Sequence, residues 1–502
     1  MAIDKVIKNV RIVRPGSSGP EQKDIGIHQG RFCEIEDDIS VDKATEVIDG
    51  NNHLAFPGLV DAHMHVGIYS PLEQDARTES KAAAMGGVTS ALTYFRTGQY
   101  YLNKGGPYAQ FYPEVLEKSA GNYWVDYGYH LAPISSGHID EMESLLINHG
   151  VSSFKIFMFY GGYGLHGKTD QNAQKEFLMI GDDDSYDMAH FEFIMRAVTK
   201  LIHKYPEYAN QISVSLHCEL ADILNAYTKI VQKDKTLTGL KAYSAARPPH
   251  SEGLAIWIAS YLAYETECLN INLLHLTSRK AVEAALMMQS TFPHINFRRE
   301  VTIGHLLLDY DTPVICHAKV NPPIRSRADV EFLWEALLDK KIDWVVSDHA
   351  CCSKELKTNN TAHDDGNNIW VSKSGFGGTE YLLSGLYSEG IKRGMSLNHM
   401  AELTSKNPAD RYGLKNKGDI AIGYDADLVL FDPDETFIVR SEESESIQGY
   451  STFEGMELTG RVKATILRGN LVYENGNTVG FAQGKYLHRP TKINHEMNNV
   501  DK

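Results

Sequence analysis

The sequence predicts an α/β protein in which a (β/α)8 barrel is accompanied by a small β domain. Short apolar runs alternate with helix-like segments through the middle of the chain, and eight such runs are enough for one barrel. Both chain ends instead show short alternating strands with turn residues between them. The expected barrel strands are residues 59–63, 89–95, 125–132, 153–158, 212–217, 271–275, 296–302 and 343–348.

The segments between and around these strands support the same organisation. Helical patterns separate most of the strands, for example at residues 79–85, 187–203 and 328–338. The two terminal segments share the same pattern of short alternating strands, so we expect both ends to build a single β-sandwich. The expected division is residues 1–56 and 416–485 for the two parts of the sandwich, 57–415 for the barrel, and 486–502 for a polar tail without fixed structure of its own.

Composition and charge exclude several classes of function. The chain of 502 residues carries a net charge of −16 and contains no lysine- and arginine-rich run, so a nucleic-acid partner is not expected. No apolar stretch approaches the ~20 residues that span a bilayer, and charges interrupt the first 13 residues, which are therefore not a signal peptide. Six cysteines in so long a chain are not a disulfide framework. We expect a cytoplasmic protein.

A buried strand that ends in two histidines is the first sign of chemistry. The apolar run 59–63 follows Pro57-Gly58 and leads into His63-Met64-His65. Side chains at positions i and i+2 of a strand lie on the same face, so both imidazoles can reach one metal ion. Because two histidines do not complete a coordination sphere, later strands must supply further ligands.

Later strands do end in residues of the right types. The fifth strand ends at His217, the sixth at His275 and the eighth at Asp348, while the fourth carries Lys155. The carboxyl ends of barrel strands meet at one face, so these residues predict a metal site there. An ammonium group cannot bind a cation, whereas a lysine carbamate could bridge two metals. The residues alone favour an unmodified structural lysine.

Such a site is suited to hydrolysis. Two divalent metals that share a hydroxide provide a nucleophile near neutral pH and a Lewis acid for a carbonyl. Asp348 could hold one metal, accept the proton of the attacking hydroxide and pass it to the leaving nitrogen. Tyr160 could donate to the developing oxyanion, or serve only in packing. Cys218, Cys351 and Cys352 flank these residues either as buried filler or as neighbours of the metal.

Taken together, the motifs resemble the amidohydrolase superfamily, and within it the dihydropyrimidinase/hydantoinase family of cyclic amide hydrolases. The resemblance extends over almost the whole chain. It is carried by residues 57–65 (PGLVDAHMH), 150–160 (GVSSFKIFMFY), 216–219 (LHCE), 247–249 (RPP), 275–278 (HLTS), 321–325 (NPPIR), 347–349 (SDH), 423–428 (GYDADL), 453–460 (FEGMELTG) and 484–489 (GKYLHR).

The resemblance implies a binuclear site with two zinc or other divalent ions per subunit. His63, His65 and Asp348 would hold one ion, His217 and His275 would hold the other, and carboxylated Lys155 would bridge them. Tyr160 would contact the substrate carbonyl, and the main chain at Asn321 and Ser374 would bind the ring imide. The implied substrate is a cyclic ureide or imide of the dihydropyrimidine or hydantoin type, and the implied assembly is a homotetramer.

Three positions depart from this family. Gly67 stands where many hydantoinases carry aspartate, and Asn321 and Ser374 stand where serine and asparagine are common. Dihydroorotase-like sequences place at the Gly67 position an arginine that binds the substrate carboxylate. Its absence favours a neutral substrate, unless Arg96 or Arg247 replaces it. A dihydroorotase or allantoinase remains the alternative enzyme, and a non-catalytic scaffold is the alternative outside catalysis.

Overall fold

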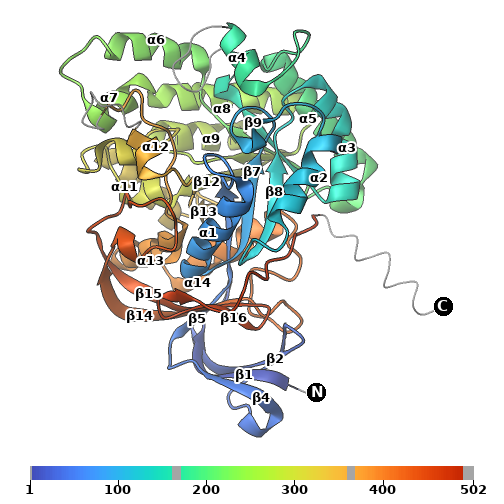
Figure 1. The fold of residues 1–502 in the computed structure, drawn as a ribbon, viewed down its shortest axis with the longest axis vertical. Helices are drawn as coiled ribbons and strands as arrows, with labels where there is room; N and C mark the ends of the chain where they lie inside the picture. The colour runs from blue at the N-terminus through green and yellow to red at the C-terminus, as the bar shows by residue number, and fades with distance from the viewer. Residues whose placement is uncertain (1–2, 161–170, 359–367, 490–502) are drawn as a thin grey trace.

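The computed structural model describes residues 3–160, 171–358 and 368–489, and it contains two sheets (Figure 1). Eight parallel strands follow one another in the order β6 to β13, and a separate sheet of nine strands lies beside them. This arrangement confirms the predicted barrel with an accessory β domain. In the described part of the chain, no helix is both long and apolar enough to cross a membrane.

The barrel strands coincide closely with the predicted ones. They are β6 (Leu59–Met64), β7 (Val88–Phe95), β8 (Asp126–Leu131), β9 (Ser153–Phe157), β10 (Ser213–His217), β11 (Asn270–Leu273), β12 (Asn296–Thr302) and β13 (Trp344–Val346). The first and last strands also meet, because Met64 forms a parallel bridge with His349. The N–H of His65 donates to the carbonyl of His349 at 2.7 Å. The ring of strands therefore closes just beyond the end of β13.

Helices surround this barrel. They are α1 (Leu72–Met85), α2 (Tyr108–Ser119), α3 (Ser136–His149), α4 (Gln171–Leu178), α5 (Met188–Lys204), α6 (Ala221–Val231), α7 (Gly239–Ala246), α8 (Pro249–Glu265), α9 (Arg279–Thr291), α10 (Ile303–Leu307), α11 (Arg327–Leu338), α12 (Lys354–Thr358), α13 (Leu382–Lys392), α14 (Leu397–Ala401) and α15 (Asn407–Arg411). In α5 the side chain of Asp187 caps the first turn, and Phe191, Ile194 and Val198 at helical spacing face the core.

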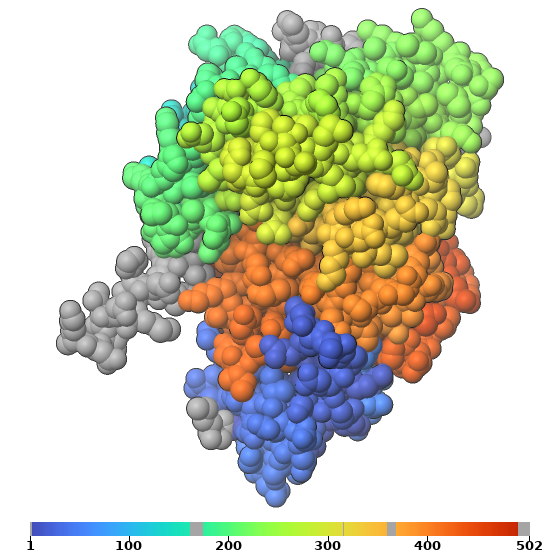
Figure 2. All heavy atoms as spheres, turned by 180° about the vertical axis from the view of Figure 1, so that it is seen from behind, coloured from blue at the N-terminus to red at the C-terminus, as the bar shows by residue number. Residues whose placement is uncertain are grey.

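Both chain ends build the second sheet. Its strands are β1 (Ile3–Ile12), β2 (Glu21–His28), β3 (Arg31–Glu36), β4 (Ala44–Asp49), β5 (Leu54–Pro57), β14 (Leu428–Ile438), β15 (Glu457–Leu467), β16 (Asn470–Glu474) and β17 (Asn477–Thr478). Antiparallel pairing of β5 with β14 joins the two halves. Figure 2 shows, from behind, the blue N-terminal residues packed against orange residues from the later part of the chain. Gly58 alone separates β5 from the barrel strand β6.

A buried ionic network fastens this sheet to the barrel. The ammonium of Lys417 lies 2.9 Å from Asp126 at the start of β8 and 2.6 Å from Asp427, next to β14. Arg468, which follows β15, also pairs with Asp126. Burial alone would lower the pKa of Lys417, but the three surrounding carboxylates raise it well above its usual value. The lysine therefore remains charged, and the network connects the two sheets.

The start of the predicted polar tail is ordered by packing against the barrel. Arg489 is fully buried and donates to the carbonyl of Tyr129, and the hydroxyl of Tyr486 donates to the carbonyl of His149 at 2.7 Å. The sequence did not indicate this contact. The acceptors of these hydrogen bonds are backbone carbonyls of the barrel, and backbone groups leave no pattern of residue types. The rest of the predicted tail, residues 490–502, lies outside the described residues.

Lys417→Met tests the network between the sheets. The substitution leaves buried carboxylates without their shared cation, so we expect the free energy of unfolding to fall by about 3–5 kcal/mol. Lys406→Met is the matched control, because Lys406 forms a solvent-exposed pair with Asp410 and such pairs contribute at most about 1 kcal/mol. Guanidinium titration measures both variants. Equal losses in the two would contradict the role given to Lys417.

Candidate metal centre and active-site cavity

The structure brings the predicted ligand residues together at the carboxyl end of the barrel. A single carboxylate oxygen of Asp348 lies 3.2 Å from Nε2 of His63 and 3.3 Å from Nε2 of His65. The ammonium nitrogen of Lys155 lies 3.4 Å from the same Nε2 of His63. The His275 ring completes the group, with its centroid 5.4 Å from that of His63 and 4.3 Å from that of His217. His63, His65 and Asp348 are close enough to share one metal ion.

Two of these residues adopt a strained backbone conformation. His275 has φ = 36° and Asp348 has φ = 53°, in the left-handed region that side-chain-bearing residues rarely occupy. Each stands two residues beyond the end of its strand, β11 or β13, so both predicted strands were slightly too long. Such strain persists only where surrounding contacts enforce it, and it is concentrated at functional sites.

A second layer of side chains orients the imidazoles. Nδ1 of His63 contacts the carboxylate of Glu300 at 2.7 Å, and Nδ1 of His65 contacts the hydroxyl of Tyr101 at 2.7 Å. These contacts leave Nε2 of both rings facing Asp348. Nε2 of His217 contacts Glu219 at 2.7 Å, which leaves its Nδ1 for a ligand. Partners of this kind fix the tautomer of a metal-binding histidine.

Sequence reasoning missed this second layer. Glu219 stands in a quoted motif but was given no role, and its carboxylate is held by Arg247 through contacts of 3.0 and 2.5 Å. Glu300 lies within the seventh barrel strand and is fully buried. The strand reads NFRREVT, so Glu300 follows two arginines, and nothing in this local pattern marks it as a buried residue.

Burial sets the protonation states of the site. It lowers the pKa of His63 and His275 well below the usual value, and that of His217 to about 4, so these rings are neutral. Burial also lowers the pKa of Lys155 to about 7, which makes a neutral amine accessible near physiological pH. For Asp348 burial acts in the opposite sense, but the adjacent His63 and His65 hold its pKa below the usual range, so it is ionised.

These donors fit a divalent metal. Neutral imidazole nitrogens together with a carboxylate are the donor set that zinc prefers. The buried Nδ1 of His275 has no hydrogen-bond partner among the described residues, as expected of a ring whose position is set by coordination rather than by hydrogen bonding. Cys218, Cys351 and Cys352 are buried free thiols, and none of them belongs to the group formed by His63, His65 and Asp348.

A cavity of about 80 Å³ adjoins this group. It is lined by the predicted residues His65, Tyr160, His217, Asn321, Asp348 and Ser374, and also by Arg96. Tyr160 ends a short 3-10 turn after β9 and stacks on Phe157 at a centroid distance of 4.7 Å. The side-chain oxygen of Asn321 accepts from the Tyr243 hydroxyl at 2.5 Å, and the carbonyl of Ser374 accepts from the Tyr69 hydroxyl at 2.8 Å.

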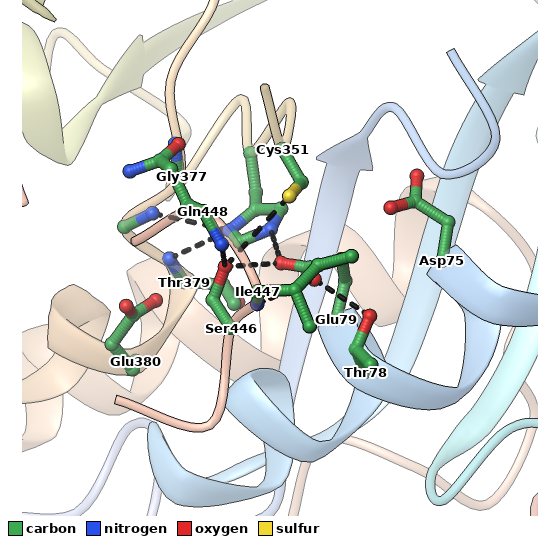
Figure 3. Close-up of polar contacts among 12 residues, drawn as sticks. Asp75, Thr78, Glu79, Cys351, Gly377, Thr379, Glu380, Ser446, Ile447 and Gln448 are labelled. Atoms are coloured by element: carbon green, nitrogen blue, oxygen red, sulfur yellow. Dashed lines mark hydrogen bonds and ion pairs between the residues drawn. The ribbon is translucent and has the colours of Figure 1, made fainter. Parts of the chain in front are cut away.

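A second acidic cluster lies behind the site (Figure 3). Asp75, Glu79 and Cys351 are also close enough to share an ion, but the carboxylate of Glu79 is already engaged. It accepts from Thr78 at 2.8 Å and from Ser446 at 2.6 Å, and it contacts Nε2 of His349 at 2.7 Å. The cluster therefore links α1 and the segment around Ser446 to His349, the neighbour of Asp348.

Comparison with known proteins agrees with this geometry. Residues 179–472, more than half of the chain, match the family described as the Amidohydrolase family, and the protein belongs to that family. The dihydropyrimidinase from Brevibacillus agri NCHU1002 is 27% identical, with a TM-score of 0.81 over 97% of this chain and 98% of that one. The L-hydantoinase (dihydropyrimidinase) from Arthrobacter aurescens is 25% identical, with a TM-score of 0.82 over 97% and 100%.

Sequence relatives carry a different name. The allantoinase of Bacillus licheniformis is 28% identical over 490 residues, which cover 94% of this chain and 97% of that protein. The allantoinase of Salmonella choleraesuis is 28% identical over 482 residues, which cover 94% and 96%. Fold, family and relatives together identify a cyclic amide hydrolase, and they leave the identity of the ring open.

Glu300→Gln tests the second layer. The amide replaces a carboxyl oxygen that contacts Nδ1 of His63 and so disturbs the contact that orients this ring; we therefore expect the affinity for a divalent metal to fall roughly 10–100-fold. Chelator competition on the folded protein measures this without reference to turnover. Glu252→Gln is the matched control, because Glu252 is an equally buried carboxylate that pairs with Arg325 outside the cavity. Unchanged affinity in Glu300→Gln would contradict the assignment.

Proposed function

We propose that the protein is a metal-dependent hydrolase that opens the amide bond of a cyclic ureide or imide of the hydantoin or dihydropyrimidine type. The observation that carries this proposal is the position of Asp348, whose carboxylate lies within 3.3 Å of two imidazole nitrogens. The same carboxylate lines the cavity that Tyr160, Asn321 and Ser374 also line. A base, a set of metal donors and ring-binding groups thus share one cavity.

We assign the metal ligands as the family resemblance implies. His63, His65 and Asp348 would hold one zinc or other divalent ion, His217 and His275 would hold a second, and carboxylated Lys155 would be a ligand of both. When bound, the ions activate a water molecule and polarise the substrate carbonyl. The low pKa of Lys155 supports the carboxylation, because carbon dioxide adds to the neutral amine.

Asp348 is assigned to proton transfer, and Tyr160 is assigned to stabilising the charge that develops on the substrate oxygen. Asp348 is ionised, so it can accept a proton from the attacking water and return it to the ring nitrogen that leaves. Burial raises the pKa of Tyr160, although Arg96 opposes this, and the phenol therefore stays protonated. Its hydroxyl is the donor that we assign to the oxyanion.

The main chain at Asn321 and Ser374 is proposed to hold the ring imide. The side-chain oxygen of Asn321 is engaged by the Tyr243 hydroxyl, and we assign the peptide group to the substrate. A carbonyl oxygen has two lone pairs, and Tyr69 uses only one of them at Ser374. Main-chain contacts of this kind explain why side-chain differences at these two positions need not change the ring that is bound.

An allantoinase is the second candidate, and the curated relatives favour it. A dihydroorotase is less favoured. Gly67 has φ = +83°, and a Cβ there would lie 3.0 Å from Leu72, so this position does not readily accept an arginine. A non-catalytic scaffold is disfavoured because every ligand position is filled.

We also propose a cytoplasmic homotetramer. One face of α8 exposes Leu254, Trp257, Tyr261 and Tyr264, each at least 45% accessible in the isolated subunit. Large aromatic side chains grouped on one surface are typical of subunit interfaces. Light scattering of the purified protein measures the mass of the assembly directly.

Lys155→Ala tests the bridge. Loss of the bridging anion removes a ligand from both ions, so we expect metal content and activity to fall together, with partial rescue by acetate or propionate. In the wild type, labelled bicarbonate should give a carbamate ¹³C signal that the variant lacks.

Lys357→Met is the matched control for that experiment. Lys357 is another fully buried lysine, but its ammonium donates to the carbonyls of Lys319 and Gly375. The control should keep its metal and show no rescue by acids. Full metal occupancy in Lys155→Ala would show that the bridge is assigned wrongly.

A substrate panel tests the proposed reaction. We expect kcat/KM for neutral cyclic ureides, namely hydantoin, dihydrouracil and allantoin, to exceed that for dihydroorotate at least tenfold. The physical reason is that the carboxylate of dihydroorotate is attached directly to the ring, where Gly67 provides no cation, and a carboxylate buried without a cation costs several kcal/mol. Dihydroorotate as the best substrate would overturn the assignment, and no turnover of any cyclic amide would overturn the proposed function.

A further inference from the structure

Arg96 is a buried arginine in the wall of the active-site cavity. It directly follows β7 at the carboxyl end of the barrel, and only 1% of its surface is accessible. The guanidinium carbon lies 5.2, 5.5 and 4.6 Å from the ring centroids of Tyr101, Tyr160 and Phe177. Three aromatic rings thus fix the position of the cation and exclude water from it.

The hydrogen bonds of Arg96 leave part of its guanidinium unused. Nη1 donates to the carbonyls of Thr97 at 2.8 Å and Gln99 at 3.2 Å, and the guanidinium also forms a side-chain hydrogen bond with the hydroxyl of Tyr160. The buried Nε has no hydrogen-bond partner among residues 3–160, 171–358 and 368–489. No carboxylate of the described residues pairs with this arginine either. A buried N–H without an acceptor costs about 1–3 kcal/mol, and more for a charged group.

Arg247, the other arginine considered as a cationic partner for the substrate, is engaged elsewhere. Its Nε and Nη2 both bind the carboxylate of Glu219, and the residue is absent from the cavity wall. Of the two arginines, Arg96 alone lines the cavity and retains an unpartnered donor.

We propose that Arg96 is a specificity-determining residue that binds a carbonyl or carboxylate oxygen at the outer end of an exocyclic substituent, beyond the atom attached to the substrate ring. This inference rests on the proposed function. There the scissile carbonyl has Tyr160 as its donor and the ring imide has the main chain of Asn321 and Ser374. A substituent is therefore the part of the ligand left for Arg96. A guanidinium edge can bind a neutral ureido carbonyl or, bidentately, a carboxylate.

The test compares hydantoins that differ only at the exocyclic position: 5-ureido (allantoin), 5-carboxymethyl and 5-isobutyl. In Arg96→Met, we expect kcat/KM for at least one of the first two to fall ten- to a hundredfold more than kcat/KM for the isobutyl compound. The extra loss should be in KM if the contact exists in both the ground and the transition state. Arg96→Lys keeps the charge but not the planar edge, so it should restore the carboxymethyl substrate better than the ureido substrate.

Arg393→Met is the matched control. Arg393 also stacks on an aromatic ring, with its guanidinium 5.1 Å from the Trp334 centroid, but it pairs with Glu331 away from the cavity. It should change all three substrates by the same factor. Arg96→Gln provides a second variant if Arg96→Met does not fold.

The outcomes separate this inference from the proposed function. Equal losses for all three hydantoins in the Arg96 variants would mean that Arg96 only supports Tyr160, and would overturn the inference while the hydrolase assignment stands. The same holds if wild type opens only the isobutyl compound. If wild type opens no cyclic amide at all, the proposed function fails first.

Discussion

Closure of the barrel between β13 and β6 is the constraint on which the site depends. The buried carboxylate of Asp61 accepts from the amide of Ser347 at 3.1 Å and from the hydroxyl of Thr379 at 2.8 Å. The backbone hydrogen bond from the N–H of His65 to the carbonyl of His349 completes this contact between β6 and β13, which we call the seam. Because His65 and Asp348 stand at opposite ends of the strand series, they share a site only where this seam is formed. The seam therefore positions both residues at the candidate metal centre.

The many buried polar groups around the site are tolerated because they have hydrogen-bond partners. Desolvation keeps the imidazoles neutral, which is the form that binds metal, but it penalises every group left without a partner. Glu300 meets this requirement for three elements at once. It contacts Nδ1 of His63, accepts from the amide of His275 at 3.1 Å and accepts from the indole of Trp344 at 2.8 Å. A single carboxyl group thus contacts residues within or just beyond the first, sixth and eighth barrel strands.

The parts that the sequence predicted well are those with a local signal. The alternation of apolar runs and helical patterns located all eight strands, and a histidine pair after an apolar run located the site. Groups that matter only through tertiary contacts had no such signal. No local sequence pattern indicates what Arg96, Tyr101 and Glu300 contact. Their roles become clear only from their neighbours in the folded structure. The left-handed turns at His275 and Asp348 were missed for the same reason, since a side-chain pattern does not encode φ.

The relatives of this protein carry different names. We relate this difference to two groups of residues in the cavity, namely the metal donors with Asp348 and the residues that line the rest of the cavity wall. Structural neighbours called hydantoinase and sequence relatives called allantoinase both cover nearly the whole chain at 25–28% identity. In the proposed reaction, hydrolysis of either ring would use Asp348 as the base and the same metal donors, so these groups would not distinguish the substrates. Discrimination must come from residues that touch what lies outside the reacting amide. In this protein Arg96 lies in that wall, between the aromatic rings of Tyr160 and Phe177. An unsatisfied donor discriminates more strongly than apolar surface does, because a ligand without an acceptor leaves the donor unpaired. One arginine after the second barrel strand can therefore shift the substrate range while the chemistry stays the same.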